Sequence, residues 1–161
     1  MPVSVGWGIL SSRTHASLNS NSTRRRTDVG AGGIIPVAKA SSKTAKRIAI
    51  VEDVQELVNL YSTALKLHGH EIVFTADSGE KAVELTRNAE FREAQVDVVI
   101  VDYRLQGMDG IETSKNILMR NPKARIIIVS ADRSAEEEAR ARGYIFVRKP
   151  FSIAELLDAI V

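Results

Sequence analysis

The sequence predicts an α/β fold, a doubly wound five-stranded parallel sheet with helices on both faces. Two observations predict it: five short runs rich in Ile and Val recur at regular intervals after Arg47, and a helix-start signal follows each run. The runs are almost continuously apolar, which is typical of parallel strands buried on both faces. The predicted strands are residues 48–51, 72–74, 96–101, 126–129 and 144–147.

The helix-start signal is an Asp or Ser followed three residues later by Glu, so that the first side chain can cap the helix while the Glu reaches back. The pairs are Asp53 with Glu56, Asp77 with Glu80, Asp109 with Glu112, Ser134 with Glu137, and Ser152 with Glu155. Strands and helices that alternate in this way predict a three-layer sandwich with right-handed crossovers. The size suits the flavodoxin-like strand order 2-1-3-4-5, in which a ligand binds where strands 1 and 3 end side by side.

Charge divides the chain into two parts. Residues 1–47 hold eight Lys or Arg and one acidic residue, Asp28, whereas residues 48–161 hold 14 basic and 19 acidic residues. Residues 1–45 are rich in Ser, Arg and Gly without a helical or strand period, which predicts a disordered basic leader before a domain at 46–161. Three interpretations of the leader stay open: a flexible tail, an organellar transit-like segment, or residues added by a start codon assigned too far upstream.

Composition excludes several function classes. The chain has no Cys, so disulfides, thiolate zinc sites and Cys nucleophiles are absent. Its longest apolar runs are far shorter than the ~20 residues of a membrane-spanning helix, so we expect a cytoplasmic protein that does not cross a bilayer. His68 and His70, on either side of Gly69, are interpreted as surface residues that bind no metal.

Three carboxylates stand where two neighbouring strands are predicted to end. Glu52 and Asp53 follow the first strand, and Asp102 follows the third. Close anions repel one another unless a proton or a cation offsets their charge, and an all-oxygen site suits Mg²⁺. The alternative is that Asp53 only caps a helix and Asp102 is an ordinary loop residue, but their joint placement favours a functional cluster.

The last two predicted strands end in groups that complement these anions. Ser130 offers a hydroxyl donor after the fourth strand, and Lys149 offers an ammonium group after the fifth. Together they could hold a phosphoryl group, although either residue alone would more often be an ordinary surface residue. A cis bond between Lys149 and Pro150 would aim the lysine inward, and the sequence leaves the isomer open.

These motifs together resemble the receiver domain of two-component response regulators. The resemblance covers about residues 46–161 and rests on Glu52-Asp53, Asp102 with Met108-Asp109-Gly110, Ser130-Ala131 and Lys149-Pro150-Phe151. It implies a switch in which Asp102 accepts a phosphoryl group from the phosphohistidine of a sensor kinase in an Mg²⁺-dependent reaction. Since the sequence stops after the fifth predicted helix, we expect a stand-alone regulator similar to the chemotaxis type, or a phosphorelay intermediate.

The resemblance also implies a metal-ligand set. Asp53, Asp102 and the main-chain carbonyl of Arg104 would bind Mg²⁺, with Glu52 acting directly or through water. In this family the lifetime of the phosphorylated state depends on the residues two places beyond the acceptor and two beyond the Ser or Thr, here Arg104 and Asp132. We expect these opposite charges to pair across the site and to slow the attack of water; the alternative is that Arg104 simply extends into solvent.

The remaining implied roles belong to the phosphoryl group and the switch. Lys149 and Ser130 would contact the phosphoryl oxygens, and Ser130 would move together with the aromatic Phe146 when the domain switches. The alternative is that Phe146 is an ordinary core aromatic, but its position three residues before Lys149 favours the switch role. Glu52 stands where Asp is common in the family, Ser130 where Thr is common, and Gln106 where Pro is common. None of these departures removes a required chemical group.

The expected partners are a sensor histidine kinase or phosphotransfer protein and a downstream effector protein, with no nucleic acid and no membrane. We expect a monomer or a phosphorylation-dependent dimer that catalyses no reaction other than its own phosphorylation and dephosphorylation.

One alternative is a receiver-like interaction domain that works without phosphorylation. Another is an aspartyl-phosphate phosphatase, which would need a second acid where Arg104 stands. The arginines at 24–26 lack interleaved aromatics, and the acidic domain would repel a nucleic-acid backbone.

Overall fold

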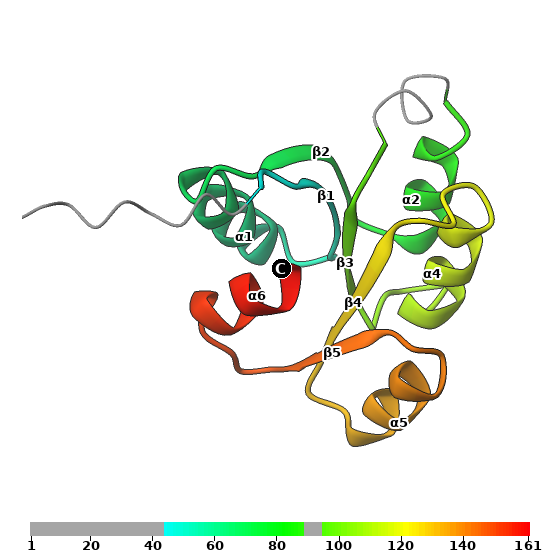
Figure 1. The fold of residues 1–161 in the computed structure, drawn as a ribbon. Helices are drawn as coiled ribbons and strands as arrows, with labels where there is room; N and C mark the ends of the chain where they lie inside the picture. Colours follow the sequence, from blue (N-terminus) through cyan, green and yellow to red (C-terminus); the bar gives the residue numbers. More distant parts are fainter. Residues whose placement is uncertain (1–43, 89–94) are drawn as a thin grey trace, which may run out of the picture. The chain divides into compact units, whose positions relative to one another are not determined.

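The computed structural model describes residues 44–88 and 95–161, so the predicted leader, apart from its last two residues, lies outside the described residues. Five parallel strands form one sheet in the order β2-β1-β3-β4-β5 (Figure 1). The predicted fold class and strand order are therefore confirmed, whereas the domain boundary at residue 46 stays a prediction. The strands are β1 (Arg47–Val51), β2 (Glu71–Ala76), β3 (Val98–Asp102), β4 (Arg125–Ser130) and β5 (Ile145–Arg148).

All five predicted strands are present, and only their ends differ. β3 begins at Val98 instead of residue 96, and β2 extends further than the predicted 72–74 at both ends. Every residue of β3 is buried, and so are all residues of β4 except Arg125. Helices shield both faces of these central strands, so an unbroken apolar run is the pattern that their sequence needs.

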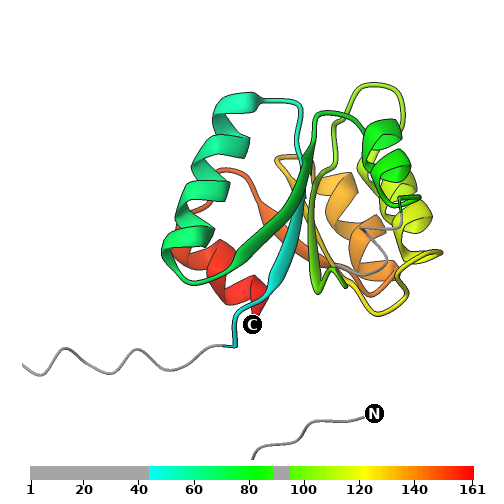
Figure 2. The ribbon, with the colours of Figure 1, turned by 90° about the horizontal axis from the view of Figure 1, so that it is seen from above.

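Helices cover the sheet on both faces, with α1 and α6 on one side and α2, α4 and α5 on the other (Figures 1 and 2). Tyr61 and Leu65 of the first helix and Leu156 of the last join one buried core with Ile50 and Ile100 of the sheet. The helices are α1 (Gln55–Leu67), α2 (Gly79–Leu85), α4 (Gly110–Leu118), α5 (Arg133–Ala141) and α6 (Ile153–Ile160). In the described part of the chain, no helix has the length and apolar character needed to span a bilayer.

Two of the five predicted helix caps are confirmed. The Asp109 carboxylate accepts the Glu112 N–H at 2.8 Å and begins α4. At α6 the Ser152 hydroxyl accepts the Glu155 N–H at 3.2 Å, and the Glu155 carboxylate accepts the Ser152 N–H at 2.7 Å, which completes a capping box. These caps fix where both helices begin, directly after loops that approach the carboxyl edge of the sheet.

The predicted caps of α2 and α5 are wrong by one or two residues. The cap of α2 is Ser78, which accepts the Lys81 N–H at 3.4 Å, because the predicted Asp77 pairs instead with the Lys81 ammonium at 3.1 Å. The cap of α5 is Asp132, whose carboxylate accepts both the N–H and the hydroxyl of the predicted Ser134, at 3.0 Å and 2.8 Å. In both loops a second polar residue competes for the capping position.

One of the two histidine interpretations is also wrong. His68 is exposed as predicted, and its Nδ1 lies 2.8 Å from the Ala64 carbonyl. His70 is buried instead, with only 7% of its surface exposed, and its Nδ1 accepts the Lys46 N–H at 3.2 Å. His70 lies at the amino-terminal ends of the strands, at the edge of the sheet opposite the carboxyl ends.

Candidate functional site

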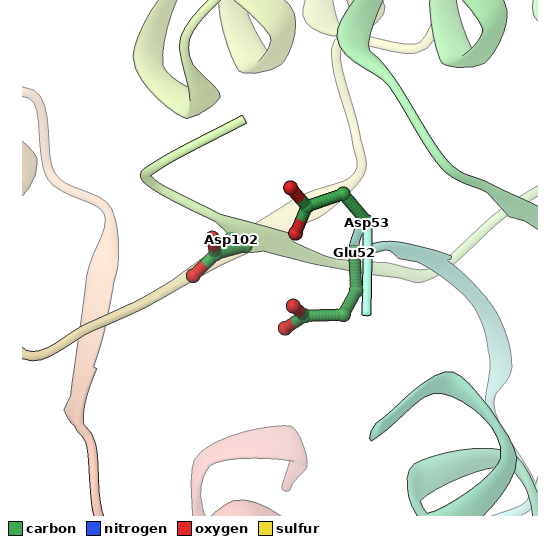
Figure 3. A group of neighbouring side chains, drawn as sticks. All are labelled: Glu52, Asp53 and Asp102. Carbon is green, nitrogen blue, oxygen red and sulfur yellow. The ribbon is translucent and has the colours of Figure 1, made fainter. Parts of the chain in front are cut away.

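Three carboxylates meet at the carboxyl ends of β1 and β3. Glu52 and Asp53 follow β1 directly, and Asp102 is the last residue of β3, whose Val101 is in register with Val51. Figure 3 shows the three side chains side by side at the strand ends, and one oxygen from each lies within 4.8 Å of the others. Because β1 and β3 are neighbours in the sheet, the strand order itself produces this cluster.

The three carboxylates differ in exposure. Glu52 and Asp102 are buried, with 2% and 6% of their surfaces exposed, whereas Asp53 is exposed. The prediction that Asp53 also caps the first helix is wrong, because the N-cap of α1 is Val54 and no side chain caps this helix. Burial raises the pKa of Glu52, and the neighbouring charge of Asp102 acts in the same direction.

Lys149 supplies the cation of the cluster. Its ammonium donates to Glu52 Oε2 at 2.8 Å and to Asp102 Oδ1 at 2.9 Å, and the Lys149–Pro150 bond is cis. Burial alone would lower the pKa of Lys149, but the hydrogen bonds to Glu52 and Asp102 and their charges outweigh burial and raise it. Lys149 is therefore charged at neutral pH and holds the two buried carboxylates together.

Ser130 lies at the end of the next strand. It is buried, with 2% exposed, and stands one residue beyond Val129, the partner of Asp102 in the β3–β4 register. Its hydroxyl accepts the Asp132 N–H at 3.0 Å, and its carbonyl accepts the Lys149 N–H at 2.9 Å. Ser130 thus links the loop after β4 to the loop that carries the lysine.

Arg104 and Asp132 form an ion pair between the loops after β3 and β4. Arg104 Nη2 lies 2.9 Å from Asp132 Oδ2, which confirms the predicted pairing. The hydrogen bond from Arg104, helped by Ser134, holds the pKa of Asp132 below its usual value. The guanidinium is mostly exposed, so the pair lies at the solvent-facing edge of the cluster.

Phe146 lies on β5, away from the carboxylates. It is half-buried against the core between the sheet and the α2, α4 and α5 layer. The Arg148 guanidinium lies over its ring, 5.9 Å from the centroid, and pairs with Glu136 of α5. Sequence reasoning missed this cover, because Arg148 and Glu136 come together only through the rotation of α5 against the sheet.

An apolar groove beside Lys149 was also missed. Its volume is about 440 Å³, and it lies between α1 and the segment that joins β5 to α6. Its lining residues are Leu57, Leu60, Tyr61, Ala131, Lys149, Pro150, Phe151 and Ile153. Leu60 is 52% exposed, so part of the surface of this groove is apolar and open to solvent.

The donor set fits a hard divalent cation. Glu52, Asp53 and Asp102 offer only carboxylate oxygens, and their three negative charges exceed the single positive charge of Lys149. The second oxygen of Glu52, Oε1, is buried and has no hydrogen-bond partner among the described residues. A buried, unpartnered carboxylate oxygen inside an anionic cluster is what a cation would satisfy.

Comparison with known proteins decides the family. The family model of the response regulator receiver domain matches residues 48–161. The chain belongs to this family. The resemblance predicted from the motifs is therefore confirmed, and receiver domains of this type are signalling proteins that bind Mg²⁺ at an acidic pocket.

The chain is similar to chemotaxis proteins and to transcriptional regulatory proteins. It is 33% identical to the chemotaxis protein CheY of Bacillus subtilis over 119 residues, which are 72% of this chain and 95% of that protein. It is 34% identical to the transcriptional regulatory protein PdtaR of Mycobacterium tuberculosis, over 78% of this chain but only 60% of that protein. It also matches a chain in the crystal structure of the CheX–CheY–BeF₃–Mg²⁺ complex of Borrelia burgdorferi, with 28% identity, a TM-score of 0.64, and coverage of 71% and 86% of the two chains.

Proposed function

We propose that this receiver domain is a phosphorylatable switch whose phosphate-accepting group is the Asp102 carboxylate. The observation that carries the proposal is the contact of Lys149 with Asp102 at 2.9 Å, at the edge of a cluster of three carboxylates. A nucleophilic carboxylate needs a cation beside it that can stabilise the charge that develops on a transferred phosphoryl group. The donor would be the phosphohistidine of a sensor kinase or of a phosphotransfer protein.

In the proposed reaction, one oxygen of Asp102 forms a bond to phosphorus while the bond from phosphorus to the histidine nitrogen breaks. The bonding electron pair leaves with the imidazole, and an acyl phosphate remains on Asp102. Lys149 and the Ser130 hydroxyl donate to the phosphoryl oxygens. Bound Mg²⁺ would neutralise the charge of the phosphoryl oxygens, and Glu52, Asp53, Asp102 and the Arg104 carbonyl would hold it.

The output would be a conformational change that a partner protein reads. Ser130 would move toward the phosphoryl group, and Phe146 would turn inward. In the Borrelia burgdorferi complex, CheY is found together with CheX, BeF₃ and Mg²⁺, which supports Mg²⁺ as the metal and a protein as the partner. For this chain we propose a histidine kinase as donor and an effector protein as receiver of the signal.

A small phosphodonor tests the acceptor. The purified full chain is incubated with acetyl phosphate and Mg²⁺, and the intact mass is measured for the wild type, Asp102→Asn and Asp97→Asn. Asp97 is the matched control, because it precedes the opposite end of β3 and as Asn can still accept the Arg47 N–H that its carboxylate accepts at 2.8 Å. We expect one phosphoryl group on the wild type and on Asp97→Asn, and none on Asp102→Asn or in the presence of a chelator. An unchanged yield in Asp102→Asn would refute the acceptor.

A further inference from the structure

The loop between β3 and α4 follows the proposed acceptor and carries Arg104. The strand side of this loop is fixed by main-chain hydrogen bonds: the Tyr103 N–H donates to the Val129 carbonyl at 3.0 Å, and the Gly110 N–H donates to the Tyr103 carbonyl at 3.0 Å. These bonds close residues 103–110 into a loop, but among the described residues the N–H groups of Gly107 and Met108, at its tip, donate to no other backbone group, and the Met108 side chain has only the Asn116 amide 3.7 Å from its sulfur. The tip therefore needs another anchor if the Arg104 carbonyl is to keep one position.

Glu80 provides that anchor from α2. Its Oε1 accepts the Met108 N–H at 2.9 Å, across 28 residues of sequence. The carboxylate also lies against the backbone of Gly107, since a Cβ at that glycine would stand 2.6 Å from Glu80 Oε1. Gly107 has φ +77°, a conformation that glycine adopts without strain, so both its backbone shape and its missing side chain admit Glu80.

The start of α2 is itself held tightly against the loop. A Cβ at Gly79 would lie 2.2 Å from Thr113 Oγ1 of α4 and 2.9 Å from the Met108 carbonyl. Such a close backbone approach leaves α2 little freedom to move relative to the loop. The backbone of Glu80 is thus held close to the loop, and its exposed carboxylate is placed by the hydrogen bond from the Met108 N–H.

We propose that Glu80 is a positioning residue for the metal site. It acts through Met108 and orders the loop whose Arg104 carbonyl is a proposed metal ligand, so this inference rests on the proposed function and deepens it. A hydrogen bond to a carboxylate is stronger than one between neutral groups, and without it the loop would have to be ordered at the moment of binding. Removing Glu80 should therefore weaken the binding of Mg²⁺ without disturbing any group that contacts the metal.

Calorimetric titration of the full chain with Mg²⁺ tests this role. Losing one such hydrogen bond should make the dissociation constant for Mg²⁺ about 3- to 10-fold larger in Glu80→Ala. Glu80→Gln should fall between the wild type and Glu80→Ala, because the amide oxygen can still accept the Met108 N–H but carries no charge. Glu84→Ala is the matched control: it removes the same charge from the same helix, but no described side chain contacts its carboxylate through a hydrogen bond.

A second readout and a second variant separate positioning from general destabilisation. Hydrogen exchange at the Met108 amide should be faster in Glu80→Ala and unchanged in Glu84→Ala. Gly107→Ala crowds the Glu80 carboxylate from the other side and should weaken Mg²⁺ binding as well. Equal binding by Glu80→Ala and the wild type, or equal weakening in Glu80→Ala and Glu84→Ala, would overturn the inference. A wild type that binds no Mg²⁺ would instead overturn the proposed metal site itself, and this inference with it.

Discussion

Replacing Lys149 by Met tests how far the fold depends on the ammonium group that contacts both buried carboxylates. Met retains the length and apolar surface of the lysine stem but carries no charge. In the wild type the ammonium donates to Glu52 at 2.8 Å and to Asp102 at 2.9 Å. The side chains of these carboxylates are only 2% and 9% exposed, so water cannot fully replace the lost partner.

The expected loss of stability follows from this burial. Removing one partner of a buried ion pair costs about 3–5 kcal/mol, because a charge is left buried and uncompensated. The Lys149 side chain is 24% exposed, so solvent already screens part of the interaction, and we take the lower end, about 3 kcal/mol. A domain of this size is stable by about 5–15 kcal/mol, so Lys149→Met should still fold.

Lys149→Met should lose less stability at low pH, because Glu52 can take up a proton there. Burial already raises the pKa of Glu52, and loss of the Lys149 hydrogen bond and charge raises it further. A carboxyl with a higher pKa in the folded state binds more protons when folded, so the free energy of unfolding falls as pH rises from the unfolded to the folded pKa. The pKa of Lys149 is raised in the folded wild type, so its contribution to stability is fully present below the unfolded pKa of 10.5. This contribution is therefore constant between about pH 5 and about pH 8. The difference between wild type and Lys149→Met should therefore grow between about pH 5 and about pH 8.

Urea unfolding followed by circular dichroism, with a chelator present, measures this difference at both pH values. Lys123→Met is the control, because this exposed lysine forms no ion pair with the described residues. Glu52→Gln combined with Lys149→Met should regain part of the lost stability, since it removes one of the two uncompensated charges. A loss below about 1 kcal/mol, or one that is equal at both pH values, would refute the reasoning.

Three further predictions concern the same site. Mg²⁺ at ten times its dissociation constant should raise the free energy of unfolding by about 1.4 kcal/mol, and Asp53→Asn should lose most of this gain. An equal gain in both proteins would show that Asp53 is not a metal ligand. Gly110→Ala should destabilise the domain by about 1–3 kcal/mol in urea unfolding, because its Cβ would lie 2.3 Å from the Asp102 carbonyl; unchanged stability would show that α4 shifts freely. Arg104→Ala and Asp132→Asn should each shorten the lifetime of the phosphorylated protein, measured by intact mass after the donor is removed. Asn is chosen at position 132 because it keeps a capping side chain for α5. Lifetimes equal to that of the wild type would show that the ion pair does not shield the phosphoryl group.

The parts of the fold that follow from local sequence pattern were predictable. An apolar run of the β3 or β4 type has few alternatives to a strand covered on both faces, and strand order then places Glu52, Asp53 and Asp102 together. The pairing of Arg104 with Asp132 was predictable for the same reason, because both residues follow neighbouring strands at equal offsets. In each case the position along a strand determines the position in space.

Contacts that depend on how a helix is rotated or where a loop tip runs were not predictable. Glu80 was predicted only as the partner of a capping Asp77, and nothing in the local sequence indicates that it accepts the Met108 N–H. The contact of Arg148 with the Phe146 ring likewise depends on how α5 packs against the sheet, because Glu136 of α5 pairs with Arg148. Where two polar residues stand side by side before a helix, as at α2, small differences in hydrogen bonding decide which one becomes the cap.

The donors of the proposed phosphoryl transfer, Lys149 and Ser130, already lie at the site and keep groups that they can donate. Lys149 contacts both Glu52 and Asp102, and it could turn toward a phosphoryl oxygen by giving up the Asp102 contact while Glu52 keeps it in place. The Ser130 oxygen accepts the Asp132 N–H, and a hydroxyl that accepts one hydrogen bond still has its own proton to donate. Glu52, which stands where the family commonly has Asp, has the longer side chain for this holding contact. The departure from the family pattern is therefore consistent with a lysine that exchanges one partner and retains the other.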